Sequence, residues 1–199
     1  MRKIVFISIM TLICNVIVAQ SAKTVLDKTA ATISHKNGVS ADFKIAGNQY
    51  GNLSGTIAVK GQKFHASTPQ VSVWFDGKTQ WTLMKRNNEV NISNPTANEL
   101  AAINPYNFIN IYRNGYKYDM KTVGKEYQVH LTATDKSRKI QEMYIHVNKA
   151  SYIPSQVKMR HGNKWNTIIV SNFKKTTLSD SQFLFNSKAY PGVEIIDLR

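Results

Sequence analysis

Residues 55–83 read GTIAVKGQKFHASTPQVSVWFDGKTQWTL, and this stretch predicts consecutive β-hairpins. Short segments rich in Val, Ile, Thr and aromatic residues alternate with turn signals. Gly61-Gln62 matches a two-residue turn with Gly in first place, and Asp76-Gly77 is typical of a type I′ turn. Similar turn pairs recur downstream, about 8–12 residues apart. The pattern predicts an antiparallel meander of about 10–11 strands.

Helices are expected in two places. Apolar residues recur at helical spacing between residues 22 and 33, with Ser21 as N-cap and Asn37-Gly38 as the stop. Residues 94–114 then interrupt the strand pattern, and Asn104-Pro105 is typical of a helix start. An interruption of about 20 residues is rarely a bare loop, so we expect a short helical lid over the sheet. The candidate lid residues are Ile103, Phe108, Ile109, Ile111 and Tyr112.

The first 19 residues have the pattern of a secretory signal peptide. Arg2 and Lys3 precede an apolar run over residues 4–18, and Ala19 is the small residue at its exit. The alternative is a membrane anchor, but a spanning helix needs about 20 apolar residues. We therefore expect cleavage after Ala19, which leaves residues 20–199 as a single domain outside the cytoplasm.

Composition excludes several classes of protein. The chain has 199 residues, of which 42% are hydrophobic and 19% charged, so it has enough apolar side chains for a folded core. Its single cysteine, Cys14, rules out a disulfide framework and a multi-thiolate zinc site. Cys14 lies inside the apolar run behind the bulky Ile13. We do not expect it to carry lipid.

No catalytic or metal-binding motif is evident. The five His residues never lie two to four positions apart, and the chain has no Gly-x-Ser-x-Gly elbow. Gly77-Lys78-Thr79 resembles the end of a phosphate-binding loop, but a strand pattern follows it instead of a helix. A distant carboxylate pair such as Asp119 and Glu142 stays open as a catalytic alternative. We expect a protein that is not an enzyme and that needs no cofactor or metal.

The chain is strongly basic, with a net charge of +14. Its lysines are scattered along the sequence, mostly at turns, rather than gathered in a basic stripe. This distribution argues against nucleic acid and favours an anionic lipid surface or an acidic partner. A solvated basic surface without any partner is the equally simple alternative.

Several predicted strands carry apolar residues on both faces, which a sheet with one solvated face does not. Such a sheet is either covered on both sides or curved around an apolar cavity, and a thick filled core is the alternative. The candidate cavity residues are Val71, Val73, Phe75, Trp81, Leu83, Met143, Ile145 and Ile169.

Five sequence blocks occur in the order found in one known family. They are GTIAVK at 55–60 leading to Phe64, WFDGKTQW at 74–81, NEV at 88–90, DSQFLF at 180–185 and YPGVEIID at 190–197. Together they resemble the outer-membrane lipoprotein carrier (LolA) family over essentially the whole chain after the signal peptide. The resemblance implies an α+β fold, an incomplete antiparallel barrel with an N-terminal helix and a helical lid over an apolar cavity.

The resemblance also implies a function. Such a protein is a monomeric periplasmic carrier that accepts acylated lipoproteins from an inner-membrane lipoprotein-releasing transporter and passes them to the outer membrane, through an acceptor where one is present. A periplasmic module of the same fold that binds or senses another lipid or glycolipid is the alternative, and a secreted hydrolase is a third. One position departs from the family, because Gly61 stands where an Arg holds the lid shut. We do not carry that contact over.

Overall fold

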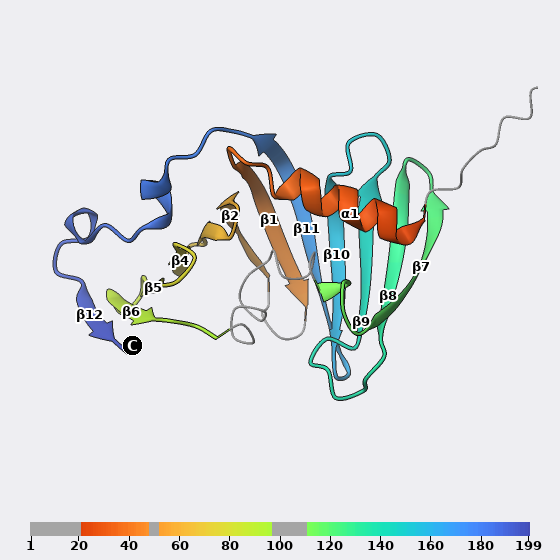
Figure 1. Ribbon diagram of the computed structural model, residues 1–199. Helices are drawn as coiled ribbons and strands as arrows, with labels where there is room; N and C mark the ends of the chain where they lie inside the picture. Colours follow the sequence, from red (N-terminus) through yellow and green to blue (C-terminus); the bar gives the residue numbers. More distant parts are fainter. Residues whose placement is uncertain (1–20, 48–51, 97–110) are drawn as a thin grey trace, which may run out of the picture.

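The computed structural model describes residues 21–47, 52–96 and 111–199 (Figure 1). Twelve strands in these ranges form one sheet, in the order β12-β6-β5-β4-β3-β2-β1-β11-β10-β9-β8-β7. The strands are β1 (Val39–Gly47), β2 (Leu53–Lys60), β3 (Lys63–Ser67), β4 (Val71–Phe75), β5 (Gln80–Met84), β6 (Glu89–Ser93), β7 (Tyr116–Val123), β8 (Glu126–Ala133), β9 (Glu142–Asn148), β10 (Pro154–His161), β11 (Lys164–Lys175) and β12 (Glu194–Asp197).

The hairpins follow from the turn residues read in the sequence. Gly61 and Gly77 both have positive φ, at 60° and 105°, which glycine adopts without strain. Gly61 joins β2 to β3, and Asp76 closes the β4–β5 turn by accepting the backbone N–H groups of Lys78 and Thr79 at 2.8 and 2.7 Å. Every neighbouring pair of strands is antiparallel except β12 and β6, which are parallel.

The helix α1 (Ala22–Ile33) begins at Ser21, whose side chain accepts the backbone N–H of Thr24 at 3.1 Å. Figure 1 shows α1 lying across one face of the sheet, in front of β7 to β11. We call this the helix face. The buried side of α1 consists of Val25, Leu26, Thr29, Ala30 and Ile33. Its apolar members belong to the main hydrophobic core together with fully buried side chains of β8, β9 and β10.

A second, smaller core lies on the opposite face of β4, β5 and β6. Trp74, Leu83 and Val90 are buried there. The segment that follows β11, with the short 3-10 helices η1 (Asp180–Phe183) and η2 (Ser187–Ala189), covers them. Trp74 makes edge contacts with the rings of Phe185 and Tyr190, at centroid distances of 5.4 and 5.8 Å.

The predicted architecture is confirmed in part. The antiparallel meander and the N-terminal helix are present, but the fold is mostly β, and its single sheet stays open, with β12 and β7 as the two ends. The sequence predicted an incomplete barrel, and the sheet is indeed open rather than a closed barrel. The second face of β4–β6 is covered by the C-terminal segment. Of the candidate lid residues, Ile103, Phe108 and Ile109 lie outside the described ranges.

None of the helices in the described ranges is long and apolar enough to span a membrane. No group of three or more His, Cys, Asp or Glu side chains in the same ranges is placed to hold a metal ion.

Candidate functional site

The helix face is apolar along rows of cross-strand neighbours. One row runs from β1 to β7 and consists of Ile45, Ile168, Val157, Ile145, Val129 and Met120. Val157, Ile145 and Val129 are fully buried, whereas Ile168 at the centre of the sheet is only partly buried. The centre of the sheet thus presents apolar side chains that keep some accessible surface.

Five of the eight candidate cavity residues lie on this helix face. Met143 and Ile145 of β9 are fully buried, and Phe75 of β4 is also buried. Val73 is partly buried against the same core, and Val71 points to the same side because strand side chains alternate. The structure therefore brings these five residues onto one surface. Whether they bind a ligand stays a prediction.

The other three candidates lie elsewhere. Trp81 and Leu83 of β5 face the second core, where Leu83 packs beside Trp74. Ile169 is 46% exposed, and its neighbour Ile168 is the one that faces the main core. Since adjacent strand residues point to opposite faces, a strand that is apolar at both positions does not reveal which one faces inward.

Sequence reasoning missed several residues of the helix face. They are Phe43, Ile45 and Ile57 on β1 and β2, and Met159 and Ile168 on β10 and β11. A signal was present in β1, where Val39, Ala41, Phe43 and Ile45 alternate with polar residues. The predicted cavity residues all came from strands with apolar residues on both faces, whereas β1 is apolar on one face only.

Tyr112, a candidate lid residue, is tied to α1. Its side chain is only 2% exposed, and its hydroxyl donates a hydrogen bond of 2.5 Å to the Asp27 carboxylate. Burial, together with the hydrogen bond and the negative charge of Asp27, raises the pKa of Tyr112 to about 12. The hydrogen bonds from Lys23 and Tyr112 in turn lower the pKa of Asp27. The chain that enters β7 is therefore anchored to the helix.

The turn at Gly61, where the family has an Arg, is held by its neighbours. Lys60 Nζ donates to the backbone carbonyl of Leu178 at 2.9 Å and to Asp180 at 3.0 Å. Lys63 pairs with the other oxygen of Asp180 at 2.9 Å. Both lysines therefore bind the C-terminal segment at η1, a contact that the sequence analysis did not anticipate.

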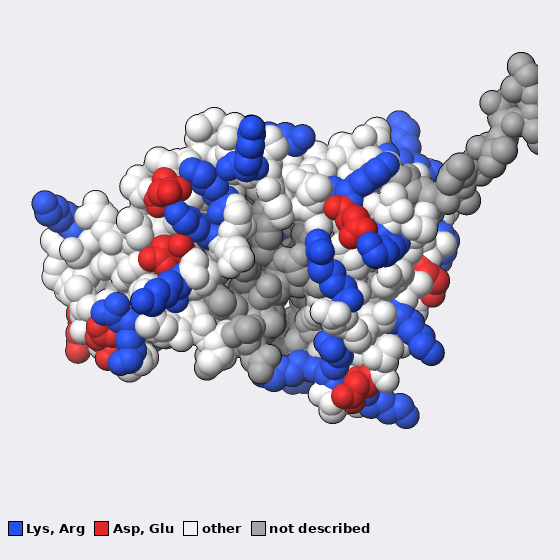
Figure 2. All heavy atoms as spheres, in the orientation of Figure 1, with Lys and Arg blue, Asp and Glu red and all other residues white. Residues whose placement is uncertain are grey.

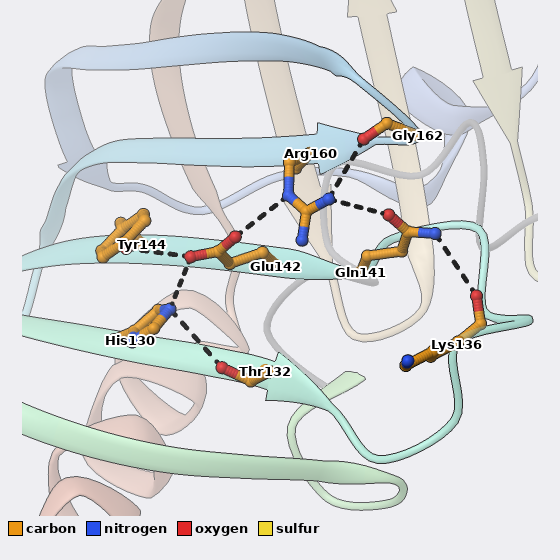
Figure 3. A network of polar contacts seen from close by, with 8 residues as sticks. All are labelled: His130, Thr132, Lys136, Gln141, Glu142, Tyr144, Arg160 and Gly162. Carbon is orange, nitrogen blue, oxygen red and sulfur yellow. Dashed lines mark hydrogen bonds and ion pairs between the residues drawn. The ribbon is translucent and has the colours of Figure 1, made fainter.

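On the face opposite α1, strands β8, β9 and β10 carry a polar network (Figure 3). Glu142 accepts hydrogen bonds from Tyr144 and Arg160, both at 3.0 Å, and lies 2.9 Å from His130 Nε2. Burial raises the pKa of Glu142, but the bonds from Tyr144, His130 and Arg160 outweigh it, so the pKa is lowered. The lowered pKa keeps Glu142 ionised beside the Arg160 cation. Together with His130 they form an ion-pair network that links β8, β9 and β10.

The second member of the carboxylate pair left open by the sequence lies beside this network. Asp119 is 3.5 Å from His130 Nδ1, and its side chain is 81% exposed. The pair is therefore bridged by His130 on an open strand surface rather than placed across a cleft. This arrangement lacks the enclosed site in which paired carboxylates act on a substrate.

A hollow of about 410 Å³ opens at β1, β2 and β3. Most of the side chains that line it are polar, among them Asp42, His65 and Lys174. His65 stacks on Trp74 at 4.9 Å, so the hollow lies beside the second core and away from the helix face. It is a different feature from the apolar cavity expected from the sequence.

Figure 2 shows the charges on the face that carries α1. Lys and Arg side chains outnumber Asp and Glu there, and they are spread over both halves of the molecule instead of forming one block. The positive charge on this face therefore does not mark a single site.

The fold and this surface define a class of protein: an open β-sheet with a helix across one apolar face. The sequence matches the family described as "Outer membrane lipoprotein carrier protein LolA" over residues 13–163, about three quarters of the chain. The protein belongs to this family, whose name describes carriers rather than enzymes. No curated protein matches the chain.

Several solved structures are similar to this chain. An uncharacterized conserved protein from Thermus thermophilus is 14% identical, with a TM-score of 0.61 over 89% of this chain and 99% of the other. A LolA superfamily protein from Nitrosomonas europaea is 13% identical, with a TM-score of 0.45 over 84% and 99%. An outer membrane lipoprotein-sorting protein domain from Vibrio parahaemolyticus is 11% identical, with a TM-score of 0.45 over 83% and 96%.

Proposed function

We propose that the protein is a periplasmic carrier that shields the acyl chains of lipoproteins on their way from the inner to the outer membrane. The observation that carries the proposal is the helix face, where whole rows of cross-strand neighbours are apolar. Its central residue Ile168 and its flanking residue Val73 are only partly buried. Membership of the lipoprotein carrier family supports the same function.

Such a carrier must shield the hydrocarbon of the acyl chains from water. Each methylene removed from water contributes about 0.8 kcal/mol, so one ordinary acyl chain contributes on the order of 10 kcal/mol. An acylated protein therefore stays in its membrane unless another apolar surface receives the chain. A carrier supplies that surface and needs no bond-making residue.

We propose two partners and a moving part. An inner-membrane releasing transporter supplies the lipoprotein, and an outer-membrane acceptor, where present, receives it from the monomeric carrier. The segment over residues 103–112 acts as the lid, and the Tyr112–Asp27 hydrogen bond anchors its C-terminal end to α1. Amide exchange over residues 103–112 is expected to change when an acyl chain binds, while β5 stays protected.

A matched pair of variants tests the proposal. Ile168 and Ile169 are neighbours in β11 that point to opposite faces, so Ile168→Asn alters the helix face and Ile169→Asn does not. A fluorescent fatty-acyl probe should bind the wild-type protein with micromolar or tighter affinity. Ile168→Asn should weaken this binding about tenfold or more through the lost apolar contact, whereas Ile169→Asn should leave it unchanged.

The stability of each variant is measured alongside by urea unfolding. Absence of probe binding to the wild-type protein, or equal effects of the two variants, would contradict the proposal. Depletion of the protein in its own bacterium should leave lipoproteins in the inner membrane. Lipoproteins that reach the outer membrane normally would instead favour binding of another lipid.

A further inference from the structure

One polar side chain interrupts the apolar rows of the helix face. Asn166 of β11 is 2% exposed. Its cross-strand row from β1 to β7 consists of Gly47, Asn166, Met159, Met143, Leu131 and Tyr118. Met143 and Leu131 are fully buried in the main core. The carboxamide of Asn166 therefore belongs to the same surface as the proposed acyl-binding residues.

The carboxamide has no hydrogen-bond partner among the described residues. Both Nδ2 and Oδ1 of Asn166 are buried, and neither finds a donor or acceptor in the part of the chain that the structure describes. Burying an amide without a partner destabilises a fold, whereas an apolar side chain of similar size would avoid that penalty. Buried polar groups are nearly always paired, so an unpaired one points to a partner that the protein alone does not provide.

The neighbouring strand leaves room for this carboxamide. A Cβ atom built on Gly47 would lie 2.4 Å from Oδ1 of Asn166 and 2.7 Å from the backbone oxygen of Trp165. Both distances are closer than real Cβ atoms come. Any larger residue at position 47 would displace Asn166. Gly47 on β1 thus leaves space for the polar side chain of Asn166 on the adjacent strand β11, within an otherwise apolar surface.

We propose that Asn166 hydrogen-bonds the carbonyl linkage of a bound acyl group, which deepens the proposed carrier function and rests on it. A hydrocarbon chain has no hydrogen-bond donor or acceptor for the carboxamide. Each acyl chain, however, is joined to the rest of its lipid or lipoprotein through an ester or an amide. Nδ2 donates to the carbonyl oxygen of either linkage, and Oδ1 accepts the N–H of an amide. The chain itself then lies on the apolar residues beyond, such as Ile168 and Ile45.

Asn166 lies outside the residues 13–163 that match the carrier family. The assignment therefore rests on the burial and the missing partners of this side chain. It predicts that the protein distinguishes acyl chains from alkyl chains of the same length, because only the acyl chain carries a carbonyl oxygen. Lipoprotein amides and membrane-lipid esters share this carbonyl, so the experiment includes one of each.

The test compares two lipids that differ only in the linkage and adds a lipopeptide whose acyl chain is joined through an amide. Displacement of a fluorescent alkyl probe is measured with diacyl phosphatidylglycerol, with its dialkyl ether counterpart, and with a lipopeptide bearing an N-palmitoyl cysteine. Wild-type protein should bind the diacyl lipid about tenfold more tightly than the ether, the factor that one hydrogen bond contributes. Displacement of the probe by the lipopeptide as well would show that an amide carbonyl is also accepted.

Variants identify the residue responsible. Asn166→Leu should reduce the diacyl-to-ether ratio to about one while its urea midpoint stays equal or rises, because a buried unpaired amide is removed. Thr167→Val, at the next residue of β11 and therefore on the opposite face, is the control and should keep the wild-type ratio. Asn166→Ala provides a second variant if the leucine does not fold.

Each result has a distinct meaning. Equal affinity of the wild-type protein for diacyl and ether lipids would overturn the role of Asn166 while leaving the carrier function intact. A folded Asn166→Leu protein with the wild-type ratio would also overturn it, as would a large loss of stability without any change in ratio. If neither lipid binds the wild-type protein, the carrier function itself fails.

Discussion

At the scale of single residues, a hydrogen bond to an ionised carboxylate connects α1 to the chain before β7. Asp27 on α1 accepts hydrogen bonds from Lys23 at 2.6 Å and from Tyr112 at 2.5 Å. The second bond joins two parts of the chain 85 positions apart. A bond to an ionised acceptor is stronger than one between neutral groups, so this pair has a measurable share in stability.

Tyr112→Phe should destabilise the protein by about 1–2 kcal/mol, since it removes a hydrogen bond to a charged group while Asp27 keeps Lys23. Because the pKa of Asp27 is lowered in the fold, this contribution is present above the ordinary pKa of an Asp and is lost as pH falls through the folded value. Urea unfolding of both proteins at pH 7 and pH 3 tests this. Tyr118→Phe is the control, and an equal cost for the two variants would contradict the assignment.

Glu142 should contribute to acid sensitivity. Its pKa is lowered in the fold, so its stabilising effect is present above its unfolded pKa and is lost as pH falls through the folded value. Wild-type protein should therefore lose more stability than Glu142→Gln between pH 6 and pH 3. Unfolding midpoints across this range measure the difference, with Glu194→Gln on exposed β12 as control. Parallel curves for wild type and Glu142→Gln would refute the expectation.

At the scale of elements, the C-terminal segment acts as a cover for the second face. After β11 the chain crosses the sheet, forms η1 and η2, and ends as β12 beside β6 (Figure 1). Lys60 and Lys63 bind Asp180 at its start, and the backbone N–H of Leu198 donates to Ile92 at its end, at 2.8 Å. The strands of the second core therefore depend on a segment that comes about 100 residues later.

Phe183→Ala should cost about 3–5 kcal/mol of unfolding free energy, because Phe183 is fully buried and its removal leaves a cavity. Leu184→Ala is the matched control: Leu184 is 44% exposed, so its loss should cost less than about 1 kcal/mol. Urea denaturation measures both. Similar costs for the two variants would mean that the segment is not docked as described.

At the scale of the whole molecule, one sheet serves two cores. The helix face belongs to the main core under α1, and the opposite face of β4–β6 belongs to the second core. Because the apolar rows of the helix face include partly buried residues such as Ile168 at the centre of the sheet, a ligand bound there adds to the main core. The ligand should then stabilise the entire fold.

An acyl ligand at about one hundred times its Kd should stabilise the protein by about 2.7 kcal/mol. For a chain of this length that corresponds to a rise in Tm of about 5–10 °C. Val73→Thr, which places a hydroxyl on the helix face at nearly constant volume, should reduce the rise. Differential scanning fluorimetry measures it, with the soluble headgroup alone as control. An equal shift with the headgroup would place the effect outside the apolar surface.

Much of the fold could be read from the chain. Turn residues such as Asp76-Gly77 and the alternation around them predicted the hairpins, since turn chemistry and side-chain periodicity are local properties. The capping residue Ser21 and the apolar spacing after it predicted α1 for the same reason. Family membership followed from short blocks of sequence in a fixed order.

The candidate site could be predicted only in part, because it depends on contacts between residues that are distant in the sequence. Of the candidate cavity residues, Phe75, Met143 and Ile145 lie on the helix face, whereas Leu83, whose strand is apolar on both sides, lies on the opposite face. Which face of a strand meets which core is decided by the strand's partners and by what covers it, here α1 on one side and a segment from the far end of the chain on the other. The sequence by itself therefore determined the strands, the helix and the family. Only the tertiary structure decided which apolar residues share a surface, and that Asn166 lies unpaired among them, because burial and pairing are properties of the assembled sheet.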